Sequence, residues 1–188
     1  MVWKGWPFFV SRTARPATVR RHVVVTLAQT AAMWIVFLWL LPWAVYFVEG
    51  LTPLARLRFD FPHRHLIAAA VFVVYGGIGI SSGMLMAIHG AGTPLPVDCP
   101  NRLIVIGPYR YVRNPMAMSS LIQGACVGVW LGSPLVIAYA LAGALVWNFI
   151  VRPWEERDLE RRFGAPYLAY KHAVRCWIPR LTPYLLDA

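Results

Sequence analysis

The chain has 188 residues, of which 59% are hydrophobic and 14% are charged, and its mean hydropathy is +0.54. Soluble domains are usually about half apolar and about a quarter charged, so this composition excludes an ordinary soluble domain and indicates one membrane-embedded domain. The net charge of +10 would suit nucleic acid, but the basic residues flank apolar runs, so we exclude that partner and assign them to anionic membrane lipids.

The first predicted membrane span covers residues 23–48, which carry no charge over 26 residues. As a helix it would be about 39 Å long, enough to cross ~30 Å of hydrocarbon with some tilt. Pro42 predicts a kink near its end. The segment before it is basic and aromatic, and we expect it to lie in the membrane interface through Trp3, Trp6, Phe8 and Phe9.

Two further apolar runs follow at residues 66–88 and 116–151, with lengths of 23 and 36 residues. The longer run exceeds a single crossing, and Gly132-Ser133-Pro134 predicts that it folds as a hairpin of two short helices. The 66–88 run carries small residues on which a second helix could pack closely, namely Gly76, Gly77, Gly79, Ser81, Ser82 and Gly83.

Four spans would place both ends of the chain on one side of the membrane. Segments 1–22, 89–115 and 152–188 carry five, three and seven of the 18 Lys and Arg residues. Because basic residues concentrate on the cytoplasmic side, we expect both termini and the 89–115 loop in the cytoplasm. The opposite side holds Arg56, Arg58 and Arg64.

The segment 107–115, which we call the motif loop, reads Gly-Pro-Tyr-Arg-Tyr-Val-Arg-Asn-Pro and lies between two predicted spans. Arginines at a membrane surface must be solvated, paired or bound to an anion, so the loop is a candidate ligand site. A plainer interpretation also stands. Asn114 and Pro115 are good helix-start residues, and the tyrosines and arginines suit an interfacial belt that contacts lipid phosphates.

The polar segment 152–164 predicts a helix that leaves the membrane. Pro153 suits its first turn, and Gly164 suits its end. It is either a well-capped juxtamembrane helix or the second half of a site. In the second case Glu155 and Glu156 face back toward the motif loop and hold the amine or hydroxyl groups of a ligand. The three cysteines are far apart and form no C-x-x-C pair, so we expect no metal site.

Together these segments carry the motifs of a known family. Gly92-Thr93-Pro94-x-Pro96 followed by the motif loop, and then Glu155-Glu156 with Phe163-Gly164, resemble the isoprenylcysteine carboxyl methyltransferase and phospholipid methyltransferase superfamily. The resemblance covers roughly residues 66–180. The closing Trp177-Ile178-Pro179-Arg180 is typical of its bacterial members.

The resemblance implies an all-α integral membrane protein of about four transmembrane helices, in a bacterial inner membrane. A helical hairpin would separate the two motifs, and a cytosolic C-terminal helix would close the cofactor site. Residues 1–65 would form an interfacial segment, the first span and an outer loop, and residues 66–188 the methyltransferase core.

The resemblance also implies S-adenosylmethionine as cofactor and S-adenosylhomocysteine as its product. It places catalytic roles on Arg113, Asn114, Glu155 and Glu156. The chain departs from the family pattern with Asn114, Ala117 and Ser119 where His, Tyr and Gly are common, and Asn keeps hydrogen bonding but removes a titratable base. The cofactor would be held by Leu103, Val105, Gly107, Pro108, Tyr109, Arg113, Asn114, Pro115, Glu155 and Glu156.

For the methyl acceptor we expect a hydrophobic or amphiphilic molecule, either a lipid amine or a prenyl carboxylate. Paired glutamates could serve an amine and arginines a carboxylate, so the residues leave this choice open. We expect entry from the bilayer through a gap between the small-residue face of 66–88 and the hairpin 116–151. The alternative is a scaffold or lipid-binding protein without enzymatic activity.

Overall fold

The computed structural model describes residues 17–93 and 99–185; Trp3, Trp6, Phe8, Phe9, Pro94 and Pro96 lie outside these ranges. The elements of the described part are all helical, which confirms the predicted all-α class. They are α1 (Val19–Met33), η1 (Trp34–Leu40), α2 (Leu41–Gly50), η2 (Pro53–Leu57), α3 (Arg64–His89), η4 (Gly107–Arg110), α4 (Pro115–Leu131), α5 (Pro134–Val146), η5 (Trp147–Val151), α6 (Arg152–Phe163) and α7 (Ala165–Ala173).

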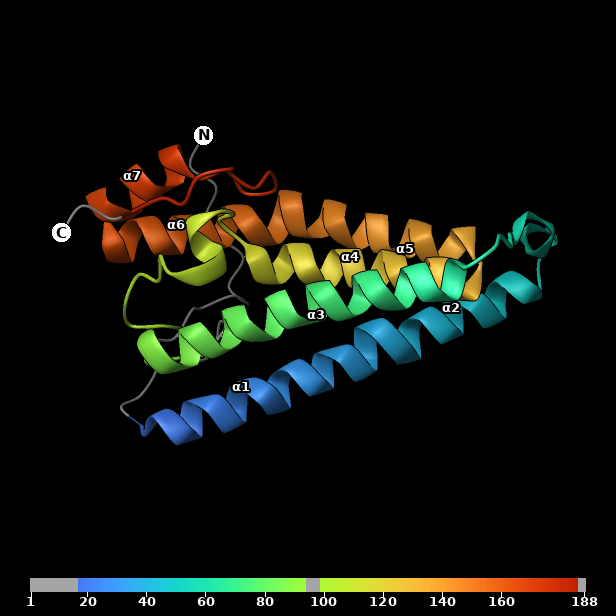
Figure 1. The fold of residues 1–188 in the computed structure, drawn as a ribbon, viewed down its shortest axis with the longest axis horizontal. Coiled ribbons are helices and arrows are strands. Elements are labelled where there is room, and N and C mark those ends of the chain that lie inside the picture. Colours follow the sequence, from blue (N-terminus) through green and yellow to red (C-terminus); the bar gives the residue numbers. More distant parts are fainter. Residues whose placement is uncertain (1–16, 94–98, 186–188) are drawn as a thin grey trace.

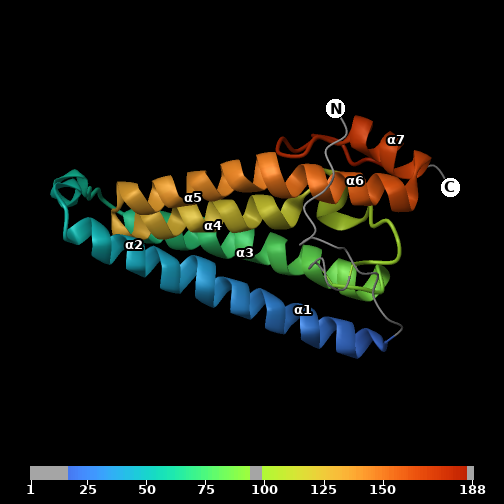
Figure 2. The ribbon, with the colours of Figure 1, turned by 180° about the vertical axis from the view of Figure 1, so that it is seen from behind.

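Three continuous helices of the described part are long and apolar enough to cross a membrane, and they make the chain an integral membrane protein. They run over Val19–Gly50, Arg64–His89 and Pro134–Phe163, and the apolar helix Pro115–Leu131 is shorter. In Figures 1 and 2 the four helices run along one long bundle, with α7 and the C-terminal segment gathered at one end of it.

The predicted hairpin between the two motifs is present and is formed by α4 and α5. Gly132 ends α4 in the left-handed region, with φ +64°, and a Cβ atom there would collide with Arg64 and with the Phe59 carbonyl. Ser133 then caps α5 by accepting a hydrogen bond from the Val136 N–H at 3.1 Å. Glycine and serine are therefore both required where the chain reverses.

The two helices that contain internal prolines continue through them, which at Pro153 differs from the expected start of a separate helix. The segment 152–164 does not begin a new helix, because α5, η5 and α6 form one helix through Pro153. A π-helical turn precedes each proline, η1 before Pro42 and η5 before Pro153. The wider turn takes up the backbone shift that a proline ring imposes on the preceding turn, so the helix continues.

Several of the small residues of α3 pack against neighbouring helices, as predicted from the sequence, whereas Gly77 and Ser81 are exposed. A Cβ atom added to Gly76 would lie 3.1 Å from Gln123 of α4, and one added to Gly83 would lie 3.2 Å from Thr26 of α1. Only small residues allow helices to approach this closely. Helix α3 thus lies between α1 and α4, and Figure 1 shows this order.

At the far end of the bundle, a buried carboxylate ties α2 to the hairpin and to Arg58. Glu49 is fully buried, lies 3.4 Å from Arg58 and accepts a hydrogen bond from the Ser133 hydroxyl. A buried carboxylate needs such partners, because leaving it unpaired is costly. Helix α2 is held against the start of α5 here.

At the opposite end, α7 and the segment after it hold the motif loop. The Tyr170 hydroxyl donates to the Tyr109 carbonyl at 2.7 Å. The backbone of the segment after α7 pairs with the loop, because Arg180 N–H donates to the Tyr111 carbonyl at 2.8 Å and Tyr184 N–H to the Arg110 carbonyl at 2.9 Å. The motif loop, α7 and the segment that follows α7 therefore form one unit at this end of the bundle, which we call the cap.

Candidate functional site

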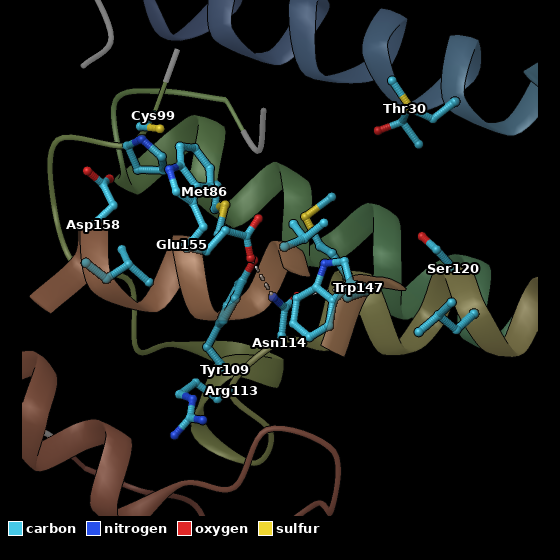
Figure 3. A pocket seen from close by; sticks show the side chains of 18 of the residues that line it. Thr30, Met86, Cys99, Tyr109, Arg113, Asn114, Ser120, Trp147, Glu155 and Asp158 are labelled. Carbon is cyan, nitrogen blue, oxygen red and sulfur yellow. Dashed lines mark hydrogen bonds between the residues drawn. The ribbon is translucent and has the colours of Figure 1, made fainter. Parts of the chain in front are cut away.

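A cavity of about 960 Å³ lies between this cap and the membrane helices. Its walls come from α1 and η1 on one side and from α5, η5 and α6 on the other, with α4, the 99–104 segment and the motif loop between them. The end near the cap is polar and carries Asn114, Glu155 and Asp158 (Figure 3). The other end is apolar and is lined by Phe37, Leu38, Leu121, Gly124, Ala140, Gly143 and Val146.

Of the ten residues predicted to hold the cofactor, five line this cavity and five lie outside its lining. The wall contains Leu103, Tyr109, Arg113, Asn114 and Glu155. Its lining does not include Val105, Gly107, Pro108, Pro115 and Glu156.

The second group shapes the cap rather than the wall. Val105 is buried against Tyr167, Tyr170 and Val174 in the core of the cap. Gly107 has φ +56°, and a Cβ atom there would lie 2.6 Å from Leu85 of α3. Glycine is thus needed at this position for the loop to approach the membrane bundle.

Asn114 connects the two motifs through both ends of its amide. Its Oδ1 atom caps α4 by accepting a hydrogen bond from the Ala117 N–H at 3.1 Å. Its Nδ2 atom donates to Glu155 Oε2 at 3.4 Å, the dashed line in Figure 3. Because the cap fixes the oxygen, the amide nitrogen must face α6. The Asn114 amide therefore accepts one hydrogen bond and donates another, which a neutral histidine ring at this position could also do.

Arg113 is fully engaged by protein groups although it borders the cavity. Its guanidinium donates to the carbonyls of Lys171 and Val174 at 2.7 and 3.1 Å, and to Glu156 Oε1 at 2.7 Å. Figure 3 shows the side chain directed toward the C-terminal segment and away from Glu155. This arginine therefore joins the motif loop to α6 and α7.

The two adjacent glutamates have different surroundings. Glu156 binds Arg113 and also lies 2.8 Å from the Lys171 ammonium. Glu155 faces the cavity, and within the described residues it has the Asn114 amide as a partner but no cation. Glu155 is thus the carboxylate that a ligand can engage, whereas Glu156 is held in the cap.

Lys171 completes this cluster of charges. Burial alone would lower its pKa, but hydrogen bonds to Glu156 and Glu160 outweigh that effect and raise the pKa of the ammonium. It stays charged and links α7 to α6.

The polar end also presents two tyrosine hydroxyls without a partner in the described part of the chain. Tyr109 and Tyr167 are almost fully buried, line the cavity and leave their hydroxyls unpaired. Burial raises the pKa of both, so both remain hydrogen-bond donors at neutral pH. Buried hydroxyls without partners indicate a place for a polar ligand.

Cys99 borders the same space but is not set up as a nucleophile. Burial raises the pKa of its thiol, and this outweighs the nearby Arg162. A thiol must lose its proton to react, so this environment keeps it inert at neutral pH.

Several wall residues were not predicted from the sequence. On α6 they are Trp154, Asp158 and Arg162, which share a face with Glu155 at helical spacing, so the period of 3.6 was the available signal. Asp158 and Arg162 form an i,i+4 ion pair at 3.3 Å. No local signal marked the residues that α1 contributes, which are Gln29, Thr30 and Met33.

The expected gap between the small-residue face of 66–88 and the hairpin is closed at Gly79. A Cβ atom added to Gly79 would lie 3.3 Å from that of Ser119, so α3 and α4 touch here. A smaller cavity of about 320 Å³ lies between the two helices nearer the start of α3, at Ala68 and Phe72. The larger cavity instead separates α1 and η1 from α5 and η5.

The C-terminal Trp177 reaches the cavity through a wall residue. Its ring packs edge-to-face on Trp147 with centroids 5.0 Å apart, and its indole N–H donates to Asn148 Oδ1 at 2.9 Å. Both partners belong to the π-helical turn η5. Trp177, the first residue of the closing Trp-Ile-Pro-Arg segment, therefore packs against η5 and helps to hold this part of the cavity wall in position.

Comparison with known proteins gives two findings. The sequence model of the phospholipid methyltransferase family matches residues 64–166, more than half of the chain. Protein-S-isoprenylcysteine O-methyltransferase A of Arabidopsis thaliana is 34% identical over 80 residues, which are 41% of this chain and 39% of the relative. The match thus spans well under half of that relative's length. Both findings confirm the resemblance that the motifs indicated.

Proposed function

The chain belongs to the phospholipid methyltransferase family, whose members are membrane methyltransferases, and we propose that it transfers a methyl group from S-adenosylmethionine to an amphiphilic acceptor. The observation that carries this proposal is the division of one cavity into a polar end and an apolar end. The polar end suits a nucleoside cofactor and a reactive head group. The apolar end suits a hydrocarbon tail.

The residues at the polar end fit this cofactor. S-adenosylmethionine supplies a methyl group on a positively charged sulfur and also carries an ammonium group and ribose hydroxyls. Glu155 and Asp158 place carboxylates in the wall, which suit cationic and hydroxyl groups. Tyr109 and Tyr167 add the two unpaired hydroxyls. We infer that these four residues, with Leu103 and Asn114, hold the cofactor.

The protein's contribution to such a reaction is alignment and exclusion of water. Methyl transfer from sulfur is an in-line displacement, so holding the reactants in position lowers its barrier most. Asn114 fixes Glu155 relative to α4, and the Arg113–Glu156 pair fixes the motif loop relative to α6. Glu155 can accept the proton of an amine acceptor or orient a cation.

The apolar end supports an acceptor that comes from the membrane. The wall between η1 and α5 lies in the membrane-spanning part of both helices. Burying each CH₂ of a tail contributes about 0.8 kcal/mol, so a lipid-like acceptor would bind here far better than its soluble head group. A lipid amine and a prenyl carboxylate both meet this requirement.

We expect the cofactor end to face the cytoplasm, because most basic residues lie on that side. A cysteine placed at Arg175 should be labelled from the cytoplasm, and one placed at the exposed Arg56 from the outside. The parent background has its three native cysteines replaced by serine, and it serves as the control. Labelling in the reverse pattern would overturn this orientation.

Cofactor binding separates an enzyme from a scaffold. At a concentration about 100 times its Kd, S-adenosylhomocysteine should stabilise the folded protein by about 2.7 kcal/mol. A thermal melt in detergent detects this stabilisation as a higher Tm. Adenosine and methionine added separately are the controls. A lipid-binding scaffold would show the same Tm with and without the cofactor product, and that result would remove the proposed activity.

A further inference from the structure

The apolar part of the cavity follows one helix and ends at a definite place. Its deepest wall residue along α5 is Tyr139. The charged helix α6 begins at Arg152, and eight of its twelve residues are charged, so the hydrocarbon region ends near that point. The helical stretch from Tyr139 to Arg152 is about 20 Å long, which is about two thirds of the hydrocarbon thickness.

A hydrogen bond between α5 and η1 closes this deep end. The Tyr139 hydroxyl donates to the Phe37 carbonyl at 3.2 Å. Both residues line the cavity, and beyond them α2 packs on α5. The bond thus lies where the two walls meet.

The reason that the Phe37 carbonyl is available is Pro42. In the π-helical turn, the Leu41 N–H bonds to the Val36 carbonyl, five residues back. The next bond of that pattern would join residue 42 to the Phe37 carbonyl, and proline has no N–H to donate. A carbonyl left unpaired in the membrane needs a partner, and the Tyr139 hydroxyl provides it.

We propose that Tyr139 forms the floor of a channel that holds one hydrocarbon tail of the acceptor, and that it limits the length of that tail. This proposal rests on the proposed function. A tail whose head group lies at Glu155 runs between η1 and α5 toward the Tyr139–Phe37 bond. Each additional CH₂ should raise apparent affinity about fourfold until the tail reaches the floor, and no further after that.

The width of the channel depends on Gly143. This glycine lies in the α5 wall one turn from Tyr139, and a Cβ atom there would meet Leu121 at an ordinary 3.7 Å. A larger side chain can therefore be accommodated by the backbone but would project into the space beside the tail. Leu145 lies on the same helix, is exposed and does not line the cavity, so it provides a matched control.

The test uses single-chain lysophosphatidylethanolamines, and S-alkyl-N-acetylcysteines as the carboxylate series, each with saturated tails of increasing length. Methyl transfer from labelled S-adenosylmethionine is measured for the wild type, Tyr139→Ala, Tyr139→Phe, Gly143→Leu and Leu145→Ala. Tyr139→Ala should extend the rise of kcat/KM to longer tails, and Gly143→Leu should lower kcat/KM for long tails at least tenfold. Leu145→Ala should keep the wild-type length profile. Tyr139→Phe keeps the ring but loses the bond to the Phe37 carbonyl, and it should shift the profile less than Tyr139→Ala.

A photoreactive diazirine at the tail end of each probe gives a readout that needs no turnover. The label should fall on Phe37, Leu38, Tyr139 or Ala140 in the wild type. If the probes label these residues with the same dependence on tail length in every folded variant, Tyr139 is not the floor of the channel. The proposed function would still stand in that case. Labelling confined to the exposed face of α5, with no methyl transfer to either series of acceptors, would overturn the proposed function itself.

Discussion

Replacing Glu155 by glutamine should weaken the binding of S-adenosylmethionine by about tenfold to a hundredfold while leaving the fold intact. Glu155 faces the cavity and, within the described residues, has no cation partner, so its charge is available to a ligand. A hydrogen bond to a charged group contributes about 1.5–3 kcal/mol, which corresponds to that loss. Glutamine has the same shape and can still accept from Asn114, so isothermal titration measures the loss of the charge.

A matched control lies on the same helix. Arg157 is exposed and does not line the cavity, so Arg157→Gln changes one charge of α6 without touching the site. It should bind like the wild type. Wild-type affinity in Glu155→Gln as well would remove Glu155 from the site.

The same titration distinguishes two roles of Glu155. S-adenosylmethionine carries a charged sulfur and S-adenosylhomocysteine does not, although both carry an ammonium group. If Glu155 faces the sulfur, the substitution will weaken the binding of S-adenosylmethionine more than the binding of S-adenosylhomocysteine. If it faces the ammonium group, both ligands will lose the same factor.

Replacing the neighbouring Glu156 by glutamine should instead destabilise the protein. Glu156 and Arg113 are only 14% and 12% exposed, and their charged atoms lie 2.7 Å apart. Removing one partner leaves Arg113 with an unpaired charge in a mostly buried place, which should cost roughly 3 kcal/mol. The measurement is the free energy of unfolding in detergent, from thermal or denaturant melts.

The ion pair between Arg64 and Asp60 is the control for this effect. Its atoms are also 2.7 Å apart, but Asp60 is 81% exposed. Exposed pairs contribute little, so Asp60→Asn should change the free energy of unfolding by less than about 1 kcal/mol. A double-mutant cycle of Glu156→Gln with Arg113→Ala should be strongly non-additive. Equal effects of Glu156→Gln and Asp60→Asn would contradict the structural role of Glu156.

Local chemistry was sufficient to predict much of this fold from the sequence. The class followed from the lengths of the apolar runs, and the hairpin followed from Gly132-Ser133-Pro134 because only a few residues suit a reversal between helices. The small residues of α3 predicted close packing because their size alone permits it. The two motifs were joined into one expected site by their resemblance to a known family, since the residues of 152–164 alone also suit a capped juxtamembrane helix.

What only the tertiary structure decided depends on contacts between distant segments. Adjacent glutamates look alike in sequence, but they point to different sides of α6, so α7 engages Glu156 and the cavity receives Glu155. The prolines do not break their helices, because a π-helical turn precedes each of them, and at Pro42 a hydroxyl from another helix also bonds to the freed carbonyl. The position of the cavity between η1 and α5 depends on how helices from distant segments pack, a balance of side-chain volumes that no single segment contains.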